Sequence, residues 1–165
     1  MAVGTRGVVV GKVVDVRRHP NGEKIWLADV DLGDGSSAQI VFGGRPVVRP
    51  SSLVPVAPPG SRLPEGTKIR RRRYRGEISE GMLCSLAELG WDLSVTDRVA
   101  LLDGSLLPGM SLDNRANDWS SIVANPRTDR AASLLRTIRE ASGSFRPRHR
   151  GLERKRLWPS HISGR

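Results

Sequence analysis

The sequence predicts an all-β fold, built as a small barrel or sandwich. About the first 80 of its 165 residues contain five short segments rich in β-branched side chains, separated by turns of glycine, proline, asparagine and aspartate. A chain of this length can bury a hydrophobic core without a metal or a disulfide. Its single cysteine, Cys84, excludes an internal disulfide and suits a reducing compartment. No segment approaches the roughly 18 apolar residues that a membrane-spanning helix needs.

The first predicted strand runs from Val8 to Val16 and reads VVVGKVVDV. Gly11 lies inside it, and an interior glycine usually marks a bulge or a bend. The second and third strands are IWLADVD (25–31) and AQIVF (38–42), which end at GDG and GG turns. Their valine, isoleucine and aromatic side chains suit the half-buried surface of a pleated sheet.

The fourth predicted strand is LVPVA, residues 53–57. Pro55 has no N–H for a ladder, so it favours an edge strand or a bulge. The fifth strand covers residues 67–75, where Ile69 and Tyr74 are the only large uncharged side chains and the natural core members. Because strict alternation would place two residues five positions apart on opposite faces, we predict a bulge or a break between them.

Less regular structure is expected after the fifth strand. Residues 83–89 predict one or two helical turns that end at Gly90, and residues 98–102 (RVALL) predict a closing strand. Residues 129–142 (DRAASLLRTIREAS) predict a helix, because apolar residues recur along one face and Gly143 follows.

We therefore expect two parts. A β-domain covers residues 1–112, and an extension covers residues 113–165 with one helix at about 129–142. The tail after that helix is basic, poor in apolar residues and interrupted by proline and glycine, so we expect it to be flexible.

The net charge of +10 is unevenly distributed. Residues 66–76 (GTKIRRRRYRG) contain six basic residues and no acid, residues 77–126 carry eight acids against two bases, and residues 127–165 carry eleven bases against three acids. A basic, partly aromatic strand beside a glycine-bearing loop can hold a sugar-phosphate backbone and meet a base or ribose. Nucleic acid is the leading partner, and a merely solvated charged strand is the alternative.

Four motifs follow one another along the β-domain: HPNGEKI (19–25), IVFGG (40–44), VPVAPPG (54–60) and RGEISEGMLCS (75–85). In order and spacing they resemble the tRNA-binding domain that is appended to bacterial phenylalanyl-tRNA synthetase beta chains and to many methionyl-tRNA synthetases. The same module occurs in free-standing tRNA-binding proteins and in the endothelial monocyte-activating polypeptide. The resemblance extends from residue 8 to about residue 112.

The resemblance implies an oligonucleotide-binding (OB) fold, a five-stranded barrel. The C-terminal helix and basic tail that the sequence itself predicts would follow this barrel. The resemblance also implies a non-catalytic clamp that binds the shape and backbone of tRNA rather than its sequence, since A-form RNA hides its base edges. Arg72 stands where relatives tend to keep a small residue, so we expect it to point outward or to add a contact. The expected RNA-binding residues are Lys68, Arg70, Arg71, Arg73, Arg75, Ser79, Glu80, Gly81, Met82 and Trp26.

For four of these residues we expect a particular contact with RNA, and for two of them packing inside the protein is the alternative. Ser79 would donate to a phosphate or a 2′-hydroxyl, and Gly81 would let the backbone approach RNA closely. Met82 would contact a base or belong to the core. Trp26 alternates with Ile25 and Leu27, which we expect to face the core. The indole would then lie outward and stack on a base, unless it serves packing or a subunit contact.

No catalytic residue, metal site or cofactor is predicted. We expect His19 to hold its turn by a hydrogen bond rather than act as a base, and Cys84 to be buried. Trp91 and Trp119 are expected to be packing anchors outside the barrel.

The sequence thus favours a free-standing, cytoplasmic tRNA-binding protein that is not an enzyme. An accessory or remnant subunit of an aminoacyl-tRNA synthetase of the phenylalanyl beta-chain type, acting in trans, is the first alternative. A protein-interaction or signalling module is the second. A homodimer stays open, and no membrane partner is expected.

Overall fold

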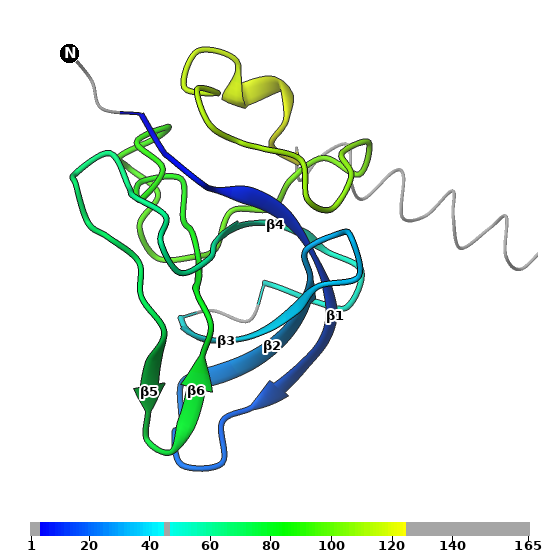
Figure 1. Cartoon of the computed structure of the whole chain (residues 1–165), viewed down its shortest axis with the longest axis vertical. Coiled ribbons are helices and arrows are strands. Elements are labelled where there is room, and N and C mark those ends of the chain that lie inside the picture. Colours follow the sequence, from blue (N-terminus) through cyan, green and yellow to red (C-terminus); the bar gives the residue numbers. More distant parts are fainter. Residues whose placement is uncertain (1–3, 45–46, 125–165) are drawn as a thin grey trace, which may run out of the picture. The chain divides into compact units, whose positions relative to one another are not determined.

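The computed structural model describes residues 4–44 and 47–124 (Figure 1). Within these residues the protein is all-β, and its one helical element is the short 3₁₀ helix Trp119–Ser121. The predicted helix at 129–142 and the tail lie outside the described residues. No helix in the described part of the chain is long and apolar enough to cross a membrane.

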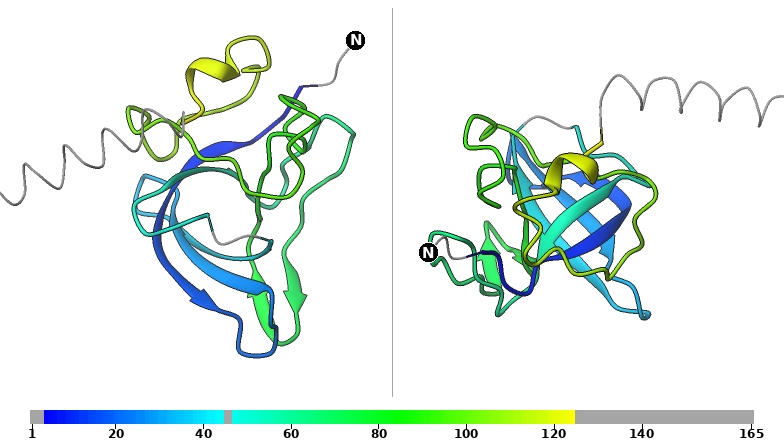
Figure 2. Two further views of the ribbon diagram at one scale, coloured as in Figure 1. Left: turned by 180° about the vertical axis from the view of Figure 1, so that it is seen from behind. Right: turned by 90° about the horizontal axis from the view of Figure 1, so that it is seen from above.

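Five strands form one antiparallel sheet in the order β3-β2-β1-β4-β7. Two short strands form a separate antiparallel hairpin. Figures 1 and 2 show that the larger sheet is strongly curved and that the hairpin lies beside the loop joining β1 to β2. The strands are β1 (Val9–Arg18), β2 (Ile25–Asp31), β3 (Ser37–Gly43), β4 (Leu53–Ala57), β5 (Arg72–Tyr74), β6 (Glu77–Ser79) and β7 (Met82–Leu83).

Strand β1 has its bulge at Val14 and not at Gly11. The register against β2 shifts between Val13 and Asp15, which leaves the exposed Val14 as the extra residue. Gly11 has a different reason to be glycine. A Cβ there would lie 2.5 Å from methyl groups of both Val30 and Val56, so the two valines pack against the bare backbone.

Strand β4 is neither an edge strand nor bulged, despite Pro55. It lies between β1 and β7, and the Pro55 carbonyl accepts a hydrogen bond of 3.0 Å from Cys84 N–H. The Cys84 carbonyl in turn accepts from Ala100 N–H at 3.0 Å, so it needs no donor from position 55. The missing N–H of proline therefore leaves no partner unsatisfied.

The core consists of two clusters, and β4 is buried on both faces because it contributes to each. Leu53 and Ala57 pack in the first cluster, with residues of the segment from Leu63 to Ile122. Val54 and Val56 pack in the second, with the inward side chains of β1, β2 and β3. Trp91 in the first cluster stacks on Trp119, with ring centroids 6.5 Å apart and planes at 10°, so both are packing anchors as predicted.

The predicted fifth strand is broken, as expected from its spacing. Ile69 belongs to the core and is paired by Ser61 and Gly60, through Ile69 N–H to the Ser61 carbonyl and Gly60 N–H to the Ile69 carbonyl, both 2.9 Å. A regular strand resumes only at Arg72, within the hairpin. The expectation that Tyr74 is a core residue is wrong, since 42% of it is exposed.

Two further expectations differ from the structure. Residues 98–102 form no strand, and they contact the sheet through single main-chain hydrogen bonds, such as Leu102 N–H to the Leu53 carbonyl at 2.8 Å. The predicted helical turns at 83–89 shrink to one turn, in which Leu89 N–H reaches the Ser85 carbonyl at 3.2 Å. Glu88 accepts from both N–H and Oγ of Ser85, which is a capping-box arrangement.

Candidate nucleic-acid interface

The end of the basic run forms β5, the first strand of the hairpin, and the tight turn that follows it. Tyr74 pairs with Glu77, which leaves Arg75 and Gly76 as a two-residue loop with φ of 47° and 102°. Two positive φ values define a type I′ turn, whose twist matches that of the flanking strands. Gly76 adopts this conformation freely, whereas Arg75 does so at a cost in backbone strain. The surrounding contacts must hold the turn in place.

The loop between β1 and β2 supplies those contacts. The Asn21 side-chain amide donates to the Arg75 carbonyl at 3.1 Å, and Arg75 Nη1 donates back to the Asn21 carbonyl at 2.9 Å. Beside them, His19 Nδ1 accepts from Asn21 N–H at 3.0 Å, so the imidazole proton lies on Nε2. That Nε2 donates to the Tyr74 carbonyl at 2.9 Å. The prediction that His19 holds its turn is confirmed, and the same ring also holds the hairpin.

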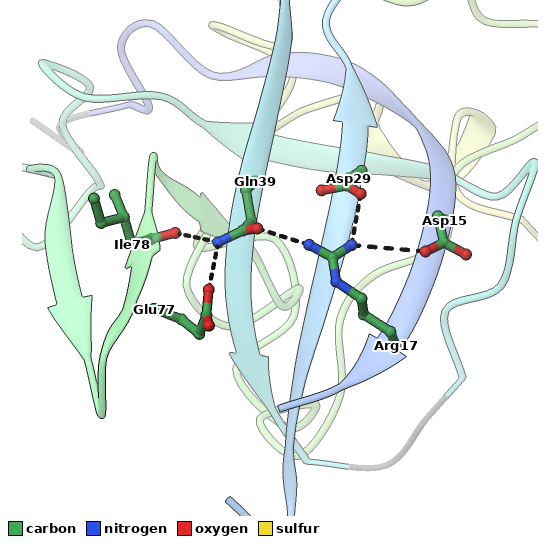
Figure 3. Close-up of polar contacts among 6 residues, drawn as sticks. All are labelled: Asp15, Arg17, Asp29, Gln39, Glu77 and Ile78. Atoms are coloured by element: carbon green, nitrogen blue, oxygen red, sulfur yellow. Dashed lines mark hydrogen bonds and ion pairs between the residues drawn. The ribbon is translucent and has the colours of Figure 1, made fainter. Parts of the chain in front are cut away.

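A polar network fixes the other side of the hairpin to the sheet (Figure 3). Gln39 on β3 donates from Nε2 to the Ile78 carbonyl at 2.9 Å and to Glu77 Oε2 at 3.3 Å. Its Oε1 accepts from Arg17 Nη2 at 2.7 Å. Arg17 also donates to Asp29 at 2.6 Å, and this hydrogen bond raises the pKa of the guanidinium above its usual value. The network therefore links β1, β2 and β3 to β6.

The basic side chains of the hairpin and its approach are exposed, yet they are not equivalent. Arg71 lies 3.4 Å from Glu80 in an ion pair, and Arg75 is tied to Asn21. Within the described residues Arg72 and Arg73 have no ion-pair partner within 4.0 Å. The same holds for Lys68 and Arg70, which precede them. These four cations are exposed, and Arg72 points outward as expected.

Ser79 and Gly81 have structural roles that were not predicted from the sequence. Ser79 is only 1% exposed, and its hydroxyl accepts from Val41 N–H at 2.9 Å and donates to the Gly81 carbonyl at 3.0 Å. The donor assigned to RNA is therefore already used inside the protein. Gly81 has a φ of 138°, and a Cβ there would lie 2.7 Å from the Ala57 carbonyl oxygen. Its close approach is to strand β4.

Met82 and Trp26 both contribute to packing. Met82 is half-buried and packs on the first core cluster. Trp26 does not lie outward as expected, because it shares a strand face with Ala28 and Val30 and packs on the second cluster. The Arg18 guanidinium lies 5.2 Å from the Trp26 ring centroid, in a cation–π contact. A stacked base would have to displace this arginine.

A groove of about 540 Å³ lies between β3 and β7, and we call it the β3–β7 groove. It lies where, among the described residues, no ladder joins these two strands. Glu80 N–H reaches the Gln39 carbonyl at 2.8 Å, and Ser79 reaches Val41, but the chain then turns away at Gly81 to pair with β4. The apolar lining comes from Ile25, Val41, Phe42, Met82, Leu83 and Val99.

Tyr74 also lines the β3–β7 groove, and it was not identified as a site residue from the sequence. Its position as the one aromatic residue within the basic run was the available signal. Asn21 and Gln39 were missed too, because their importance lies in contacts with residues 54 and 39 positions away. A second, more open cleft of about 770 Å³ is lined by residues 18–25 and Arg75.

The one cysteine of the chain is buried. Burial raises the pKa of the Cys84 thiol well above its usual value, and so keeps the thiol protonated. Within residues 4–44 and 47–124 no three histidine, cysteine, aspartate or glutamate side chains lie close enough together to hold a metal ion.

Known proteins contain segments similar to this sequence. The phenylalanine–tRNA ligase beta subunit of Symbiobacterium thermophilum is 43% identical over 122 residues, which cover 70% of this chain and 13% of that protein. The corresponding subunit of Clostridium acetobutylicum is 31% identical over 153 residues, 88% of this chain and 19% of that protein. The chain thus spans less than a fifth of the length of these relatives. The longer alignment includes part of residues 113–165.

A solved structure, described as that of a MetRS related protein from Pyrococcus horikoshii, has a TM-score of 0.46 and 16% identity, over 62% of this chain and 85% of that one. The family model described as a putative tRNA binding domain matches residues 8–111. This match covers most of the β-domain and all four motifs found in the sequence. The chain therefore belongs to the family of putative tRNA-binding domains.

Proposed function

We propose that this protein binds tRNA without catalysing a reaction, and that the hairpin β5–β6 is its main electrostatic contact. The observation that carries the proposal is that exposed arginines, with no ion-pair partner among residues 4–44 and 47–124, lie on a hairpin that several hydrogen bonds hold in place. Arg72 and Arg73 lie on a two-stranded element that His19, Asn21 and Gln39 fix to the sheet from two sides. Cations held in a fixed arrangement recognise the spacing of phosphates, and so the shape of a folded RNA.

In this proposal the fold acts as a five-stranded OB barrel. The strong curvature of the sheet supports a barrel in which the hairpin side of the chain closes one seam. The hydrogen bonds from Val41 N–H to Ser79 Oγ and from Glu80 N–H to the Gln39 carbonyl also support it. Residues 113–165 add a second electrostatic contact, because 127–165 carry eleven bases against three acids. A cytoplasmic location follows from this role.

The salt dependence of binding tests the proposal. If about six phosphates are neutralised, log K falls with log salt with a slope of roughly −4 to −5. Replacing Arg72 and Arg73 by alanine should reduce the steepness of that slope by about 1.4 to 1.8. The double variant should also bind all tRNAs more weakly, and to the same degree. A matched control replaces Lys12 and Arg49, which are exposed elsewhere, and removes the same charge. Equal slopes for the two double variants would exclude the hairpin from the interface.

A second candidate function is to act in trans on a phenylalanyl-type synthetase. The observation that favours it is the alignment with the Clostridium subunit, which continues beyond the family domain. Under this alternative the chain co-purifies with a synthetase and raises its aminoacylation rate when added. A chain that binds tRNA but leaves that rate unchanged would count against this second candidate.

A further inference from the structure

The β3–β7 groove has the lining of a site for a flat, neutral ring. Its volume of about 540 Å³ lies within the range of about 300–1,000 Å³ that is usual for small-ligand sites. We propose that it takes one unstacked nucleobase of the bound RNA, with the base against the ring of Tyr74 and its phosphate outside. This inference rests on the proposed function, because the RNA that supplies the base is the one held by the hairpin.

Tyr74 is placed to act as the stacking surface. Its main-chain carbonyl is fixed by His19 Nε2 at 2.9 Å, while 42% of the residue is exposed. The Tyr74 backbone is thus anchored, and a large part of the residue stays outside the core. Aromatic rings on OB-type surfaces stack on bases regardless of sequence, because every base has a π-face.

The edge of β3 offers hydrogen-bonding groups along the same groove. The Gln39 carbonyl and Val41 N–H both point away from β2, toward residues 79 and 80. Main-chain groups alternate along an antiparallel strand, so those of Gly43 point the same way. Among the described residues the Gly43 N–H has no hydrogen-bond partner on this side. A donor on an open strand edge suits the acceptors on the edge of a base.

Charge explains why the base enters and the phosphate does not. Glu88 and Asp97 line the groove together with Arg98, so the interior offers no net attraction to an anion. Glu88 is already engaged by Ser85 at 2.7 Å. Arg72 and Arg73, which have no ion-pair partner within the part of the chain that the structure describes, lie on β5, whose Tyr74 lines the groove. A nucleotide held by Arg72 or Arg73 therefore keeps its phosphate on the hairpin, and only its neutral ring reaches the apolar lining.

The ring of Tyr74 can be observed directly, since the chain has only one tyrosine. With selectively labelled tyrosine, the ring NMR signals should move upfield on addition of a short single-stranded RNA, because a stacked base imposes its ring current. A blunt RNA duplex with the same number of phosphates should leave them in place, since its bases are already stacked. Equal shifts with both RNAs, or none with the single strand, would overturn the proposal.

Affinities provide the second measurement. Tyr74→Ala should lower the affinity for single-stranded RNA about 5- to 150-fold, which corresponds to the loss of one base–aromatic stack. Tyr74→Phe should bind within about twofold of the wild type, and the salt slope should stay the same in both because no charge changes. Leu93→Ala is the matched control, as it truncates another exposed apolar side chain. Unchanged RNA affinity of Tyr74→Ala would show that the groove is not a base site.

The two proposals fail in different ways. If the wild-type chain binds neither tRNA nor single-stranded RNA, the proposed function is wrong and the base site falls with it. If it binds tRNA with the expected salt slope while the Tyr74 ring signals do not shift with single-stranded RNA, only the base-site proposal is wrong. Thermal unfolding of each variant checks that the fold is retained, and the exposed position of Tyr74 leads us to expect an unchanged midpoint.

Discussion

The imidazole Nε2 of His19 donates a hydrogen bond of 2.9 Å to the main-chain carbonyl of Tyr74, a residue 55 positions later. The other ring nitrogen accepts from Asn21, so the whole ring is used to join a loop to a hairpin. This single side chain connects two segments whose sequence motifs are far apart. It explains why a buried histidine in this protein needs no catalytic role.

Replacing His19 by alanine should loosen the hairpin more than the sheet. The change leaves the Tyr74 carbonyl and Asn21 N–H without a partner and should lower the free energy of unfolding by about 1–3 kcal/mol. Hydrogen exchange should accelerate at Arg72–Ser79 while β2 and β3 keep their protection. Asn21→Ala removes only the side-chain bond to Arg75 and should have a smaller effect. Uniform acceleration along the chain would contradict this account.

Replacing Glu80 by glutamine should tighten RNA binding. The carboxylate pairs with Arg71 at 3.4 Å and repels phosphate, so its neutralisation frees one more cation. Since the pair is exposed, we expect a modest gain of about 2- to 10-fold and a salt slope steeper by up to about 0.9. Filter binding at several salt concentrations would measure both. Asp34→Asn, at an exposed turn position, is the control, and an equal gain there would show a general charge effect.

Gly11→Ala should destabilise the fold by about 1–3 kcal/mol, because the new methyl group would overlap the side chains of Val30 and Val56. Gly104→Ala is the matched control. A Cβ at Gly104 meets nothing within 4 Å, so its unfolding free energy should hardly change. Chemical denaturation of both variants measures the difference. Similar stabilities would mean that β1 can shift to make room.

Cys84 should make stability depend on alkaline pH. Burial raises the pKa of the thiol in the folded state, so its contribution is complete below the unfolded value of about 8.5 and is lost as pH rises above it. The unfolding free energy should fall by at most about 1.4 kcal/mol per pH unit in this range. Cys84→Ala should flatten this part of the profile, measured by denaturation at pH values below and above 8.5. Identical profiles would contradict the assignment.

Much of the sheet could be predicted from the sequence. Strands β1 to β4 are runs of β-branched residues between glycine and proline turns, and their bounds agree with the predicted ones to within about two residues. The break after Ile69 also followed from local spacing. Local chemistry decides these features, so a pattern of neighbours along the chain is enough to find them.

The remaining features depend on partners that are distant in the sequence. Pro55 is tolerated inside the sheet only because Ala100 satisfies the Cys84 carbonyl. Tyr74 is exposed because β5 pairs with β6 and not with the main sheet. The Ser79 hydroxyl accepts a hydrogen bond from Val41 N–H, a contact that no sequence motif predicts. Tertiary pairing overrides strand pattern at each of these positions.

The attachment of the hairpin has an evolutionary consequence. In the described part of the chain β5 and β6 form ladders with each other alone, and neither hydrophobic cluster includes a residue of β5. Substitutions along β5 should therefore change surface charge without disturbing either cluster. Selection can therefore change the charge of this hairpin independently of folding. Lineages that share this scaffold are expected to differ most in the arginine content of this one small ribbon.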